Sequence, residues 1–312
     1  MTLRFTLRQL EYFVAVGEEG SIAKASERVN VSSPSISAAV TQLEDEFDIP
    51  LFVRKHAHGL TLTQAGRQFM VQAQRVLHEA DAMYKLATKI SGNVQGPLRV
   101  GCLLTFAQML VPGLRRAFEE QFPLVQVKQY ELDQLDIFDR LRQAEIDLAL
   151  TYDLDIPSDF KFVPLFELPP FAMMNETHSL AHLSAVSIDE LQEYPMVMLN
   201  LPHSVDYFLS FFTAIGVEPN IMERTRDMAV LRSLVANGFG YSIANLRPLN
   251  DLSPDGRPLK FIPLTGPVRS LNIGIVMIDG ADHTLTVDTF VQHCRTYVQT
   301  SEIVGANSKR NS

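Results

Sequence analysis

The chain has 312 residues, 46% of them hydrophobic, and a net charge of −9 at pH 7, which is enough for two or three domains with real cores. No apolar run approaches the roughly 18 residues of a membrane span, and the N-terminus lacks the apolar block of a signal peptide, so we expect a cytoplasmic protein. Cys102 and Cys294 are far apart without C-x-x-C spacing, which argues against a disulfide framework or metal cluster. Each is expected to be a small buried hydrophobe rather than a redox sensor.

Charge is unevenly distributed along the chain. Residues 1–95 hold ten Lys and Arg and ten Asp and Glu, which leaves 17 basic and 26 acidic residues for the rest. A neutral N-terminal segment is weak electrostatic evidence for nucleic-acid binding, so that hypothesis has to depend on the residue pattern.

Three short helices are predicted at the N-terminus, over Leu7–Gly17, Ile22–Arg28 and Pro34–Phe47. Ser21 is expected to cap the second. A tight turn precedes the third, where Ser33 is the expected N-cap and Pro34 the first helical residue, because proline has no amide to lose there. Spacings of three and four place an apolar stripe on the inner face of each helix. The expected inward residues are Leu10, Phe13, Val14, Ile36, Ala39, Val40, Leu43 and Phe47.

Periodicity alone fits an ordinary helical hairpin as well as a DNA-binding helix-turn-helix. The outer face of the third helix decides between them, because its side chains are short or neutral, whereas a solvated face normally carries charges. Small hydroxyl and amide groups allow close approach to phosphates and base edges. This pattern favours a recognition helix in a major groove.

Two strand-like pieces follow, around Leu51–Arg54 and Gly59–Thr61, and flank a basic tip that includes His56. This is the layout of a winged helix-turn-helix; a plain solvated hairpin is the alternative, but its position beside the helix favours phosphate contact. The residues predicted to contact DNA are Ser32, Ser33, Pro34, Ser35, Ser37, Ala38, Thr41 and Gln42 on the helix, and Arg54, Lys55 and His58 at the tip.

A long helix is predicted from Thr63 to about Ile90. Its apolar residues average a spacing of 3.5, which is the coiled-coil period and predicts a dimer. A core helix of one globule is the alternative, although nothing before residue 95 could cover so long a stripe. A short linker, Ser91–Pro97, ends the helix. The stripe consists of Phe69, Ala73, Val76, Ala80, Met83, Ala87 and Ile90.

After the linker, strands and helices alternate in the order βαβαβ, which predicts a parallel sheet with crossover helices. A similar alternation begins near Phe171. The strand at 271–278 and a helix at Leu285–Gln299 have no partner in the second unit and are placed back on the first. The expected strands are 98–102, 125–131, 146–152, 171–174, 196–200, 221–224 and 240–244, and the expected helices are 109–121, 137–144, 188–192, 205–215 and 229–236.

The result is an α/β protein with an all-α winged helix-turn-helix domain at 1–62, a linker helix at 63–91 and a two-lobed α/β domain at 92–312. Lobe I is expected at about 97–166 and 268–300, and lobe II at about 171–259. Two crossing strands, near Phe166–Phe171 and Leu259–Val268, are expected to join the lobes. Ligands in such folds bind in the cleft at the carboxyl ends of the strands.

The whole arrangement up to about residue 300 resembles the LysR-type transcriptional regulators. The resemblance is carried by "LRQLEYFVAVGEEGSIAKASERVNVSSPSISAAVTQLEDEFDIPLFVRKHAHGLTLTQAG", "GPLRVG", Pro112, "EIDLALTY" and "LVANGFGYSIAN". It implies a homodimer or homotetramer that binds promoter DNA and senses a small molecule between two periplasmic-binding-protein-like lobes. Many members carry Gln and Arg on the recognition helix where this chain has Ser33, Ala38, Ala39 and Thr41, so bidentate Arg-guanine contacts are not available from that face.

The effector cleft is predicted partly from residues and partly from this resemblance. The Thr105 hydroxyl follows the first strand and precedes a helix, where an anion would be welcomed, and the resemblance adds further positions. Ordinary lobe packing is the alternative for Phe106 and Tyr152. An organic acid or similarly polar metabolite is the expected effector. The predicted effector residues are Thr105, Phe106, Gln134, Tyr152, Asn200, His203, Ser204 and Thr225, the last on a crossing segment.

Two other classes of protein compete with a regulator. The lobes alone would suit a solute-binding protein, which would need a signal segment for export. An enzyme is the third class, but G-x-S-x-G, H-E-x-x-H, G-x-x-x-x-G-K-[ST] and G-x-G-x-x-G are all absent. The histidines show no metal-ligand spacing, and no cofactor or metal is expected.

Overall fold

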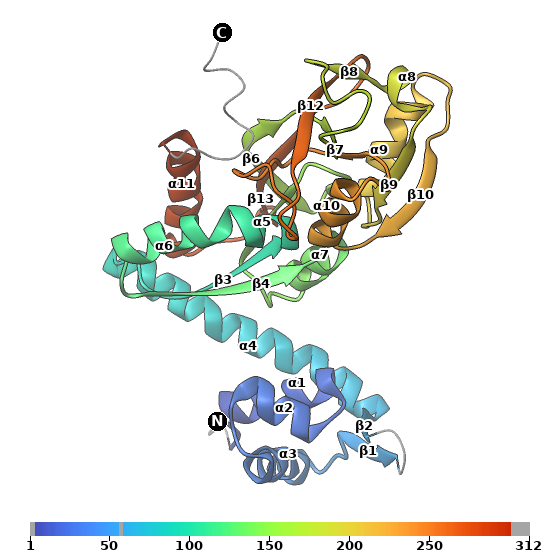
Figure 1. The fold of residues 1–312 in the computed structure, drawn as a ribbon. Helices are drawn as coiled ribbons and strands as arrows, with labels where there is room; N and C mark the ends of the chain where they lie inside the picture. Colours follow the sequence, from blue (N-terminus) through green and yellow to red (C-terminus); the bar gives the residue numbers. More distant parts are fainter. Residues whose placement is uncertain (1–3, 56–58, 301–312) are drawn as a thin grey trace. The chain divides into compact units, whose positions relative to one another are not determined.

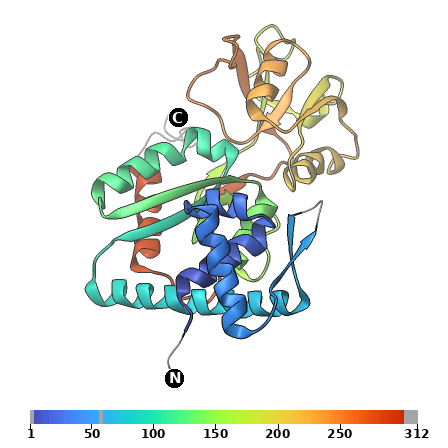
Figure 2. The same ribbon diagram turned by 90° about the horizontal axis from the view of Figure 1, so that it is seen from below.

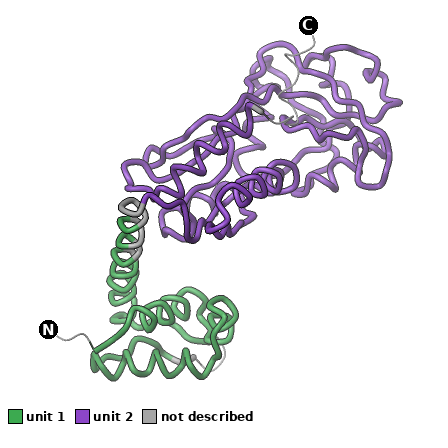
Figure 3. The backbone as a smooth tube through the Cα atoms, turned by 90° about the vertical axis from the view of Figure 1, so that its left-hand side faces the viewer, with its two compact units in different colours: residues 1–91 green, residues 92–312 purple. Residues whose placement is uncertain are grey.

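The computed structural model describes residues 4–55 and 59–300, and the chain divides after Ser91 into two compact units. We call residues 1–91 unit 1 and residues 92–312 unit 2 (Figure 3). No helix in the described ranges has both the length and the apolar character needed to cross a bilayer.

Unit 1 contains the three predicted helices, a hairpin and a long helix (Figure 1). Ser21 caps the second helix as predicted, since its hydroxyl accepts from the Lys24 amide. The predicted N-cap of the third helix was wrong by one residue: Ser32 is the cap, because the helix begins at Ser33 and Pro34 is its second residue. The elements are α1 (Leu7–Glu19), α2 (Ile22–Val29), α3 (Ser33–Phe47), β1 (Phe52–Lys55), β2 (Gly59–Leu62) and α4 (Gln64–Ser91).

The predicted apolar stripes form the core of unit 1. Val14 is half-buried and packs against the same core. Phe47 is 38% exposed but packs edge to face against Phe69 of α4, with ring centroids 4.9 Å apart. The remaining inward predictions are confirmed as buried residues: Leu10, Phe13, Ile36, Ala39, Val40 and Leu43.

Lobe I of unit 2 has a five-stranded sheet in the order β4-β3-β5-β13-β6. The first three strands are parallel as predicted, and β13 returns from the end of the chain to pair with β5 and β6. Side chains alternate along the strands, so α5, α6 and α11 cover one face and α7 covers the other. The elements are β3 (Gly96–Leu103), α5 (Leu104–Met109), α6 (Val111–Gln121), β4 (Val125–Leu132), α7 (Gln134–Arg142), β5 (Leu148–Tyr152), β6 (Phe160–Leu168), β13 (Leu271–Ile278) and α11 (Leu285–Thr300).

The helix predicted from Met109 begins earlier and is broken in two. Leu104 to Met109 already form α5, so Thr105 lies inside a helix and not before one, as the sequence had suggested. Pro112 is the second residue of α6. A proline lacks the amide that would continue the ladder of α5, so the chain restarts as α6.

Lobe II combines a four-stranded sheet, β11-β7-β12-β8, with a parallel pair, β10-β9. Its strands also alternate: Ala172 and Met174 of β7 face α8 and α9, while Phe171 and Met173 face α10. Figure 2 shows the two lobes of unit 2 joined by the crossing segments. The elements are β7 (Phe171–Asn175), β8 (Val186–Ser187), α8 (Ile188–Leu191), β9 (Pro195–Leu199), α9 (Ser204–Thr213), β10 (Asn220–Thr225), α10 (Met228–Ala236), β11 (Ser242–Ala244) and β12 (Leu259–Thr265).

Two sequence predictions about the crossing segments were wrong. Residues 259–265 form β12, which pairs with β7 inside the lobe II sheet and does not cross between lobes. The chain passes between the lobe sheets at 169–170 and 266–270 instead. Thr225 is the last residue of β10 and lies within lobe II. Strand pairing across some 85 residues cannot be deduced from local pattern.

Candidate functional site

The outer face of α3 lies at the surface of unit 1. Ser32, Pro34, Ser35, Ala38, Thr41 and Gln42 are exposed, while Ser33 and Ser37 are half-buried. The hydroxyls of Ser32 and Ser35 lie 2.8 Å apart and share a hydrogen bond. From Ser32 to Gln42 the face holds no ionised side chain, so this part of it can approach a nucleic-acid groove closely without having to remove a tightly held charge from water.

Hydrogen bonds tie α3 to α1 and fix the turn between α2 and α3. The side-chain amide of Gln9 on α1 donates to the side-chain oxygen of Gln42 at 2.9 Å. In the turn before α3, the Ser26 hydroxyl donates to the Val31 carbonyl at 2.6 Å, and Asn30 adopts a left-handed conformation with φ of 54°, which asparagine tolerates better than most residues. These contacts set the position of α3 relative to α1 and α2.

The β1–β2 hairpin is held beside α3. The Glu44 carboxylate of α3 accepts from the amides of Leu51 and Phe52 at 2.7 and 3.1 Å. Gly66 allows the start of α4 to approach this segment, because a Cβ there would lie 2.1 Å from the Leu51 carbonyl oxygen. The backbones of Arg54 and Lys55 lie on β1; their side chains, and His56 and His58 altogether, lie outside the described residues.

The predicted stripe on α4 is only partly covered within unit 1. Ala73 is 3% exposed and packs with Met70 against α1. Farther along the stripe, Val76 is 41% and Met83 73% exposed, and Leu86, which is not one of the predicted stripe residues, is 59% exposed. A stripe of large apolar side chains left in water is typical of an association surface.

Three of the predicted effector residues meet at the carboxyl end of β5 in lobe I. The rings of Phe106 and Tyr152 stack edge to face with centroids 4.8 Å apart. The Thr105 hydroxyl hydrogen-bonds the Tyr152 phenol, and burial raises the pKa of that phenol well above its usual range. The phenol therefore stays neutral and can donate or accept a hydrogen bond.

Gln134 and His203 lie near the same strand end. The buried Gln134 amide donates to the Leu154 carbonyl. His203, just before α9 of lobe II, lies 2.9 Å from the Asp155 carboxylate of lobe I. Both His203 and Asp155 have positive φ, 61° and 42°, a conformation with a steric cost for residues other than glycine. This contact links the two lobes directly.

The other predicted effector residues form a second group within lobe II. The backbone amide of Asn200 donates to the backbone carbonyl of Thr225 at 2.7 Å, so the ends of β9 and β10 lie together. Ser204 is the first residue of α9. The eight residues therefore fall into one group around β5 and a smaller group at the ends of β9 and β10.

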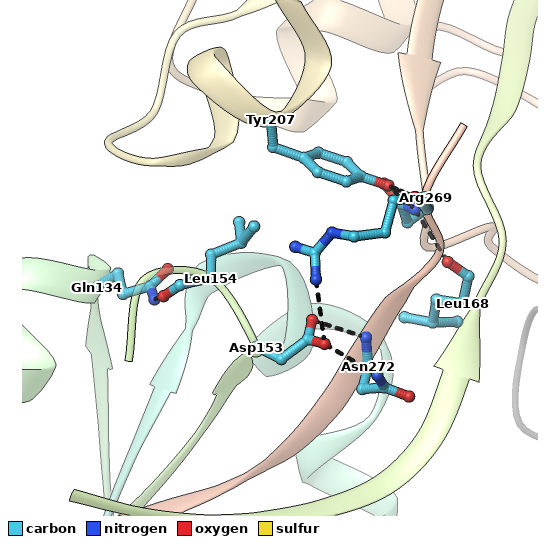
Figure 4. Close-up of polar contacts among 8 residues, drawn as sticks. Gln134, Asp153, Leu154, Leu168, Tyr207, Arg269 and Asn272 are labelled. Atoms are coloured by element: carbon cyan, nitrogen blue, oxygen red, sulfur yellow. Dashed lines mark hydrogen bonds and ion pairs between the residues drawn. The ribbon is translucent and has the colours of Figure 1, made fainter. Parts of the chain in front are cut away.

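Sequence reasoning missed a polar network at the crossing segments (Figure 4). The Tyr207 phenol of α9 donates to the Arg269 carbonyl at 2.6 Å and accepts from Asn245 at 2.9 Å. Asp153 accepts from the Asn272 backbone and side-chain amides at 2.9 and 2.8 Å. Asp153 could have been noticed, since it follows Tyr152 at a strand end, but no local signal pairs Tyr207 with residue 245 or 269. We call these five residues the hinge network.

The described residues offer little for metal or thiol chemistry. No group of three or more His, Cys, Asp and Glu side chains among them could hold a metal ion. Cys102 and Cys294 are both buried in the lobe I core, as predicted. Burial raises the pKa of the Cys102 thiol to about 12 and also raises that of Cys294, so neither is a thiolate at neutral pH.

Two family models match almost the whole chain. Residues 7–67 match the bacterial regulatory helix-turn-helix protein, lysR family, and residues 91–299 match the LysR substrate binding domain. The crystal structure of HinK, a LysR family transcriptional regulator from Pseudomonas aeruginosa, is 32% identical, with a TM-score of 0.64 over 94% of this chain and 99% of that one.

Other relatives span the whole architecture. The hydrogen peroxide-inducible genes activator of Haemophilus influenzae is 28% identical over 88% of this chain and 91% of its own. Full-length CbnR in complex with its target DNA has the same fold, with 23% identity and a TM-score of 0.56 over 94% of this chain and all of that one.

Proposed function

Since this chain belongs to the LysR family of transcriptional regulators, we propose which of its residues read DNA and which receive the effector. The chain is a DNA-binding transcriptional regulator with an effector-binding domain, and regulators of this family act as oligomers. The match of residues 7–67 to a helix-turn-helix model argues against a solute-binding protein without DNA function. We also propose that the chain catalyses no reaction of its own and works in the cytoplasm, where promoter DNA lies.

The exposed neutral face of α3 is the observation that supports the DNA interface most directly. In the proposal α3 lies in the major groove and the β1–β2 hairpin approaches a flanking phosphate. Ser35 and Gln42 hydrogen-bond base edges or phosphates, and the methyl groups of Ala38 and Thr41 contact thymine methyls. The face holds no arginine, so DNA shape and deformability carry a larger share of specificity. The remaining contacts are assigned to Ser32, Ser33, Pro34, Ser37, Arg54, Lys55 and His58.

The effector residues are proposed as two groups that approach one molecule from different sides. Phe106 and Tyr152 would supply aromatic surface, and Asn200 and Thr225 would supply polar groups from lobe II. The Thr105 hydroxyl and the Gln134 amide are already paired within the protein, so an effector must share or replace those hydrogen bonds. A polar metabolite such as an organic acid can do so. The full set comprises Thr105, Phe106, Gln134, Tyr152, Asn200, His203, Ser204 and Thr225.

Several relatives are named hydrogen peroxide-inducible genes activator, but we do not propose peroxide as the signal for this chain. Reaction of a cysteine with peroxide requires an accessible thiolate. Cys102 and Cys294 are buried, and burial raises the pKa of both thiols. A reversibly bound metabolite agrees better with these surroundings.

Selection of binding sites from a random DNA pool by the full-length protein tests the regulator assignment. A symmetric dimer should enrich an inverted repeat, because the symmetry of the site mirrors that of the protein. Affinity for the selected site should fall steeply with salt, as phosphate contacts release counterions. Failure to enrich any sequence would overturn the proposed interface.

A further inference from the structure

A cavity of about 330 Å³ lies beside α10 in unit 2. Its walls come from the end of α5 in lobe I and from β7, α10, β12 and the segment after β11 in lobe II. None of its lining residues belongs to the effector set proposed above. Most of the wall is apolar and includes Met109, Phe171, Met173, Met228, Leu246 and Phe261.

Arg232 of α10 also lines the cavity and adds a positive charge to this largely apolar wall. Its Nε atom is buried and has no hydrogen-bond partner. One of its terminal nitrogens donates to the Leu252 carbonyl and lies 3.3 Å from the Asn250 side-chain oxygen. Within the described part of the chain, Arg232 has no carboxylate within ion-pair distance. A buried guanidinium donor without an acceptor costs free energy that a ligand oxygen can recover.

Burial lowers the pKa of Arg232, and the charge of nearby Asp251 only partly opposes this effect. The direction agrees with a desolvated cation that lacks a close counterion. The side chain nevertheless stays charged at neutral pH, because arginine titrates far above it.

The volume of the cavity indicates how large a part of a ligand it can hold. At ~30 Å³ for each water molecule, a volume of about 330 Å³ corresponds to a compact molecule of roughly ten non-hydrogen atoms. A second negative charge placed among the methionine and phenylalanine side chains would find no second cation in the wall to pair with, which is costly. One negative charge and an apolar body match the walls best.

We propose that this cavity binds an amphipathic monocarboxylate, whose carboxylate pairs with Arg232 and whose apolar body packs against the methionine and phenylalanine wall. The cavity has walls from both lobes, so its occupant contacts α5 and α10 together. The inference adds a second ligand site to the proposed effector-binding function, and its regulatory meaning rests on that function. Binding itself can be measured without DNA.

Calorimetry on the full-length protein tests whether binding depends on the ligand's carboxylate and on the positive charge of Arg232. Octanoate, which has ten non-hydrogen atoms, is the probe, and octanol is the neutral control of similar size. Octanoate should bind at least ten-fold more tightly than octanol, and Arg232→Gln should weaken octanoate roughly ten-fold or more, as expected for loss of a charge-assisted hydrogen bond. Arg232→Lys should recover part of the affinity. Arg116→Gln, on the exposed outer surface of α6, should leave binding unchanged.

Methyl spectra of protein labelled at methionine locate the ligand. Octanoate should shift the methyl signals of Met109, Met173 and Met228 in the parent protein. Ala229→Phe, which fills the cavity from α10, should abolish both these shifts and the binding heat. Failure of octanoate to bind at millimolar concentration, or equal affinity in Arg232→Gln, would overturn the assignment. Loss of DNA selection with normal octanoate binding would instead count against the proposed DNA interface alone.

Discussion

Substitution of Met83 by glutamate should separate the protein into smaller species. Met83 is 73% exposed on α4, and Val76 and Leu86 on the same side of the helix are 41% and 59% exposed. The position of Met83 on a stripe with the coiled-coil period predicts that a second copy of α4 covers these side chains. A carboxylate there would have to be buried in the seam unless the helices separate.

The free energy gained when two copies of α4 pair can be worked out from the exposed fractions of these side chains. Those three side chains together expose a little less than two whole apolar side chains per chain. A symmetric seam covers twice that amount. At about 1.5–3 kcal/mol for each fully buried side chain, the seam gains about 5–10 kcal/mol. Two glutamates facing each other there would cost several kcal/mol, enough to remove most of this gain.

Sedimentation velocity measures the outcome directly. The parent protein should sediment as a dimer or tetramer and Met83→Glu as a smaller species, with the difference largest at low protein concentration. Val71→Glu is the matched control, because Val71 lies on the same helix, is 61% exposed and is not part of the stripe. If Met83→Glu keeps the parent mass while the control behaves identically, α4 is not the seam.

Four further outcomes are expected. Replacing Ser35 and Thr41 together by glutamate should abolish the promoter mobility shift without changing the thermal melt, since two carboxylates would face phosphate; an unchanged shift contradicts the recognition face. Thr105→Val should raise the effector concentration for half response by roughly ten-fold; an unchanged transcription titration rules out the contact. Cys102 should not react with a thiol reagent at pH 8 until the protein unfolds, and rapid native labelling would contradict its burial. Tyr207→Phe should lower the free energy of unfolding by about 1–3 kcal/mol in urea, and an unaltered urea midpoint would show that its two hydrogen bonds contribute nothing.

Local periodicity predicted unit 1 well because its elements depend on neighbours in the chain. The inner stripe of α3 contains Ile36 and Leu43, both fully buried, and the outer face contains the exposed Ser35 and Thr41. Helical spacing alone assigns these faces. The N-cap of α3 was misplaced by one residue since Ser32 and Ser33 are equally good capping side chains, and the sequence offers no basis for choosing between them.

The lobes were harder to predict, because their contacts join distant segments. The parallel core of lobe I followed from the order of strands and helices, whereas the membership of β12 in lobe II depends on its pairing with β7, some 85 residues earlier. The cavity at Arg232 is an extreme case: its walls come from α5, β7, α10 and the segment after β11. The sequence around Arg232 reads as an ordinary amphipathic helix, with no sign that this arginine lacks a counterion.

The strengths of the links between the lobes indicate how an effector can act on unit 2. The carboxylate that contacts His203 is 72% exposed, so solvent weakens this contact, and even a fully charged surface pair is worth about 0–1 kcal/mol. Tyr207 and Asn245 of the hinge network are buried, at 6% and 4% exposed, so leaving their groups unpaired would cost more. A ligand can shift the lobes only by its differential affinity for two arrangements. The least costly motion therefore breaks the His203 link and keeps the hinge network, which makes rotation about the crossing segments the expected response to an effector.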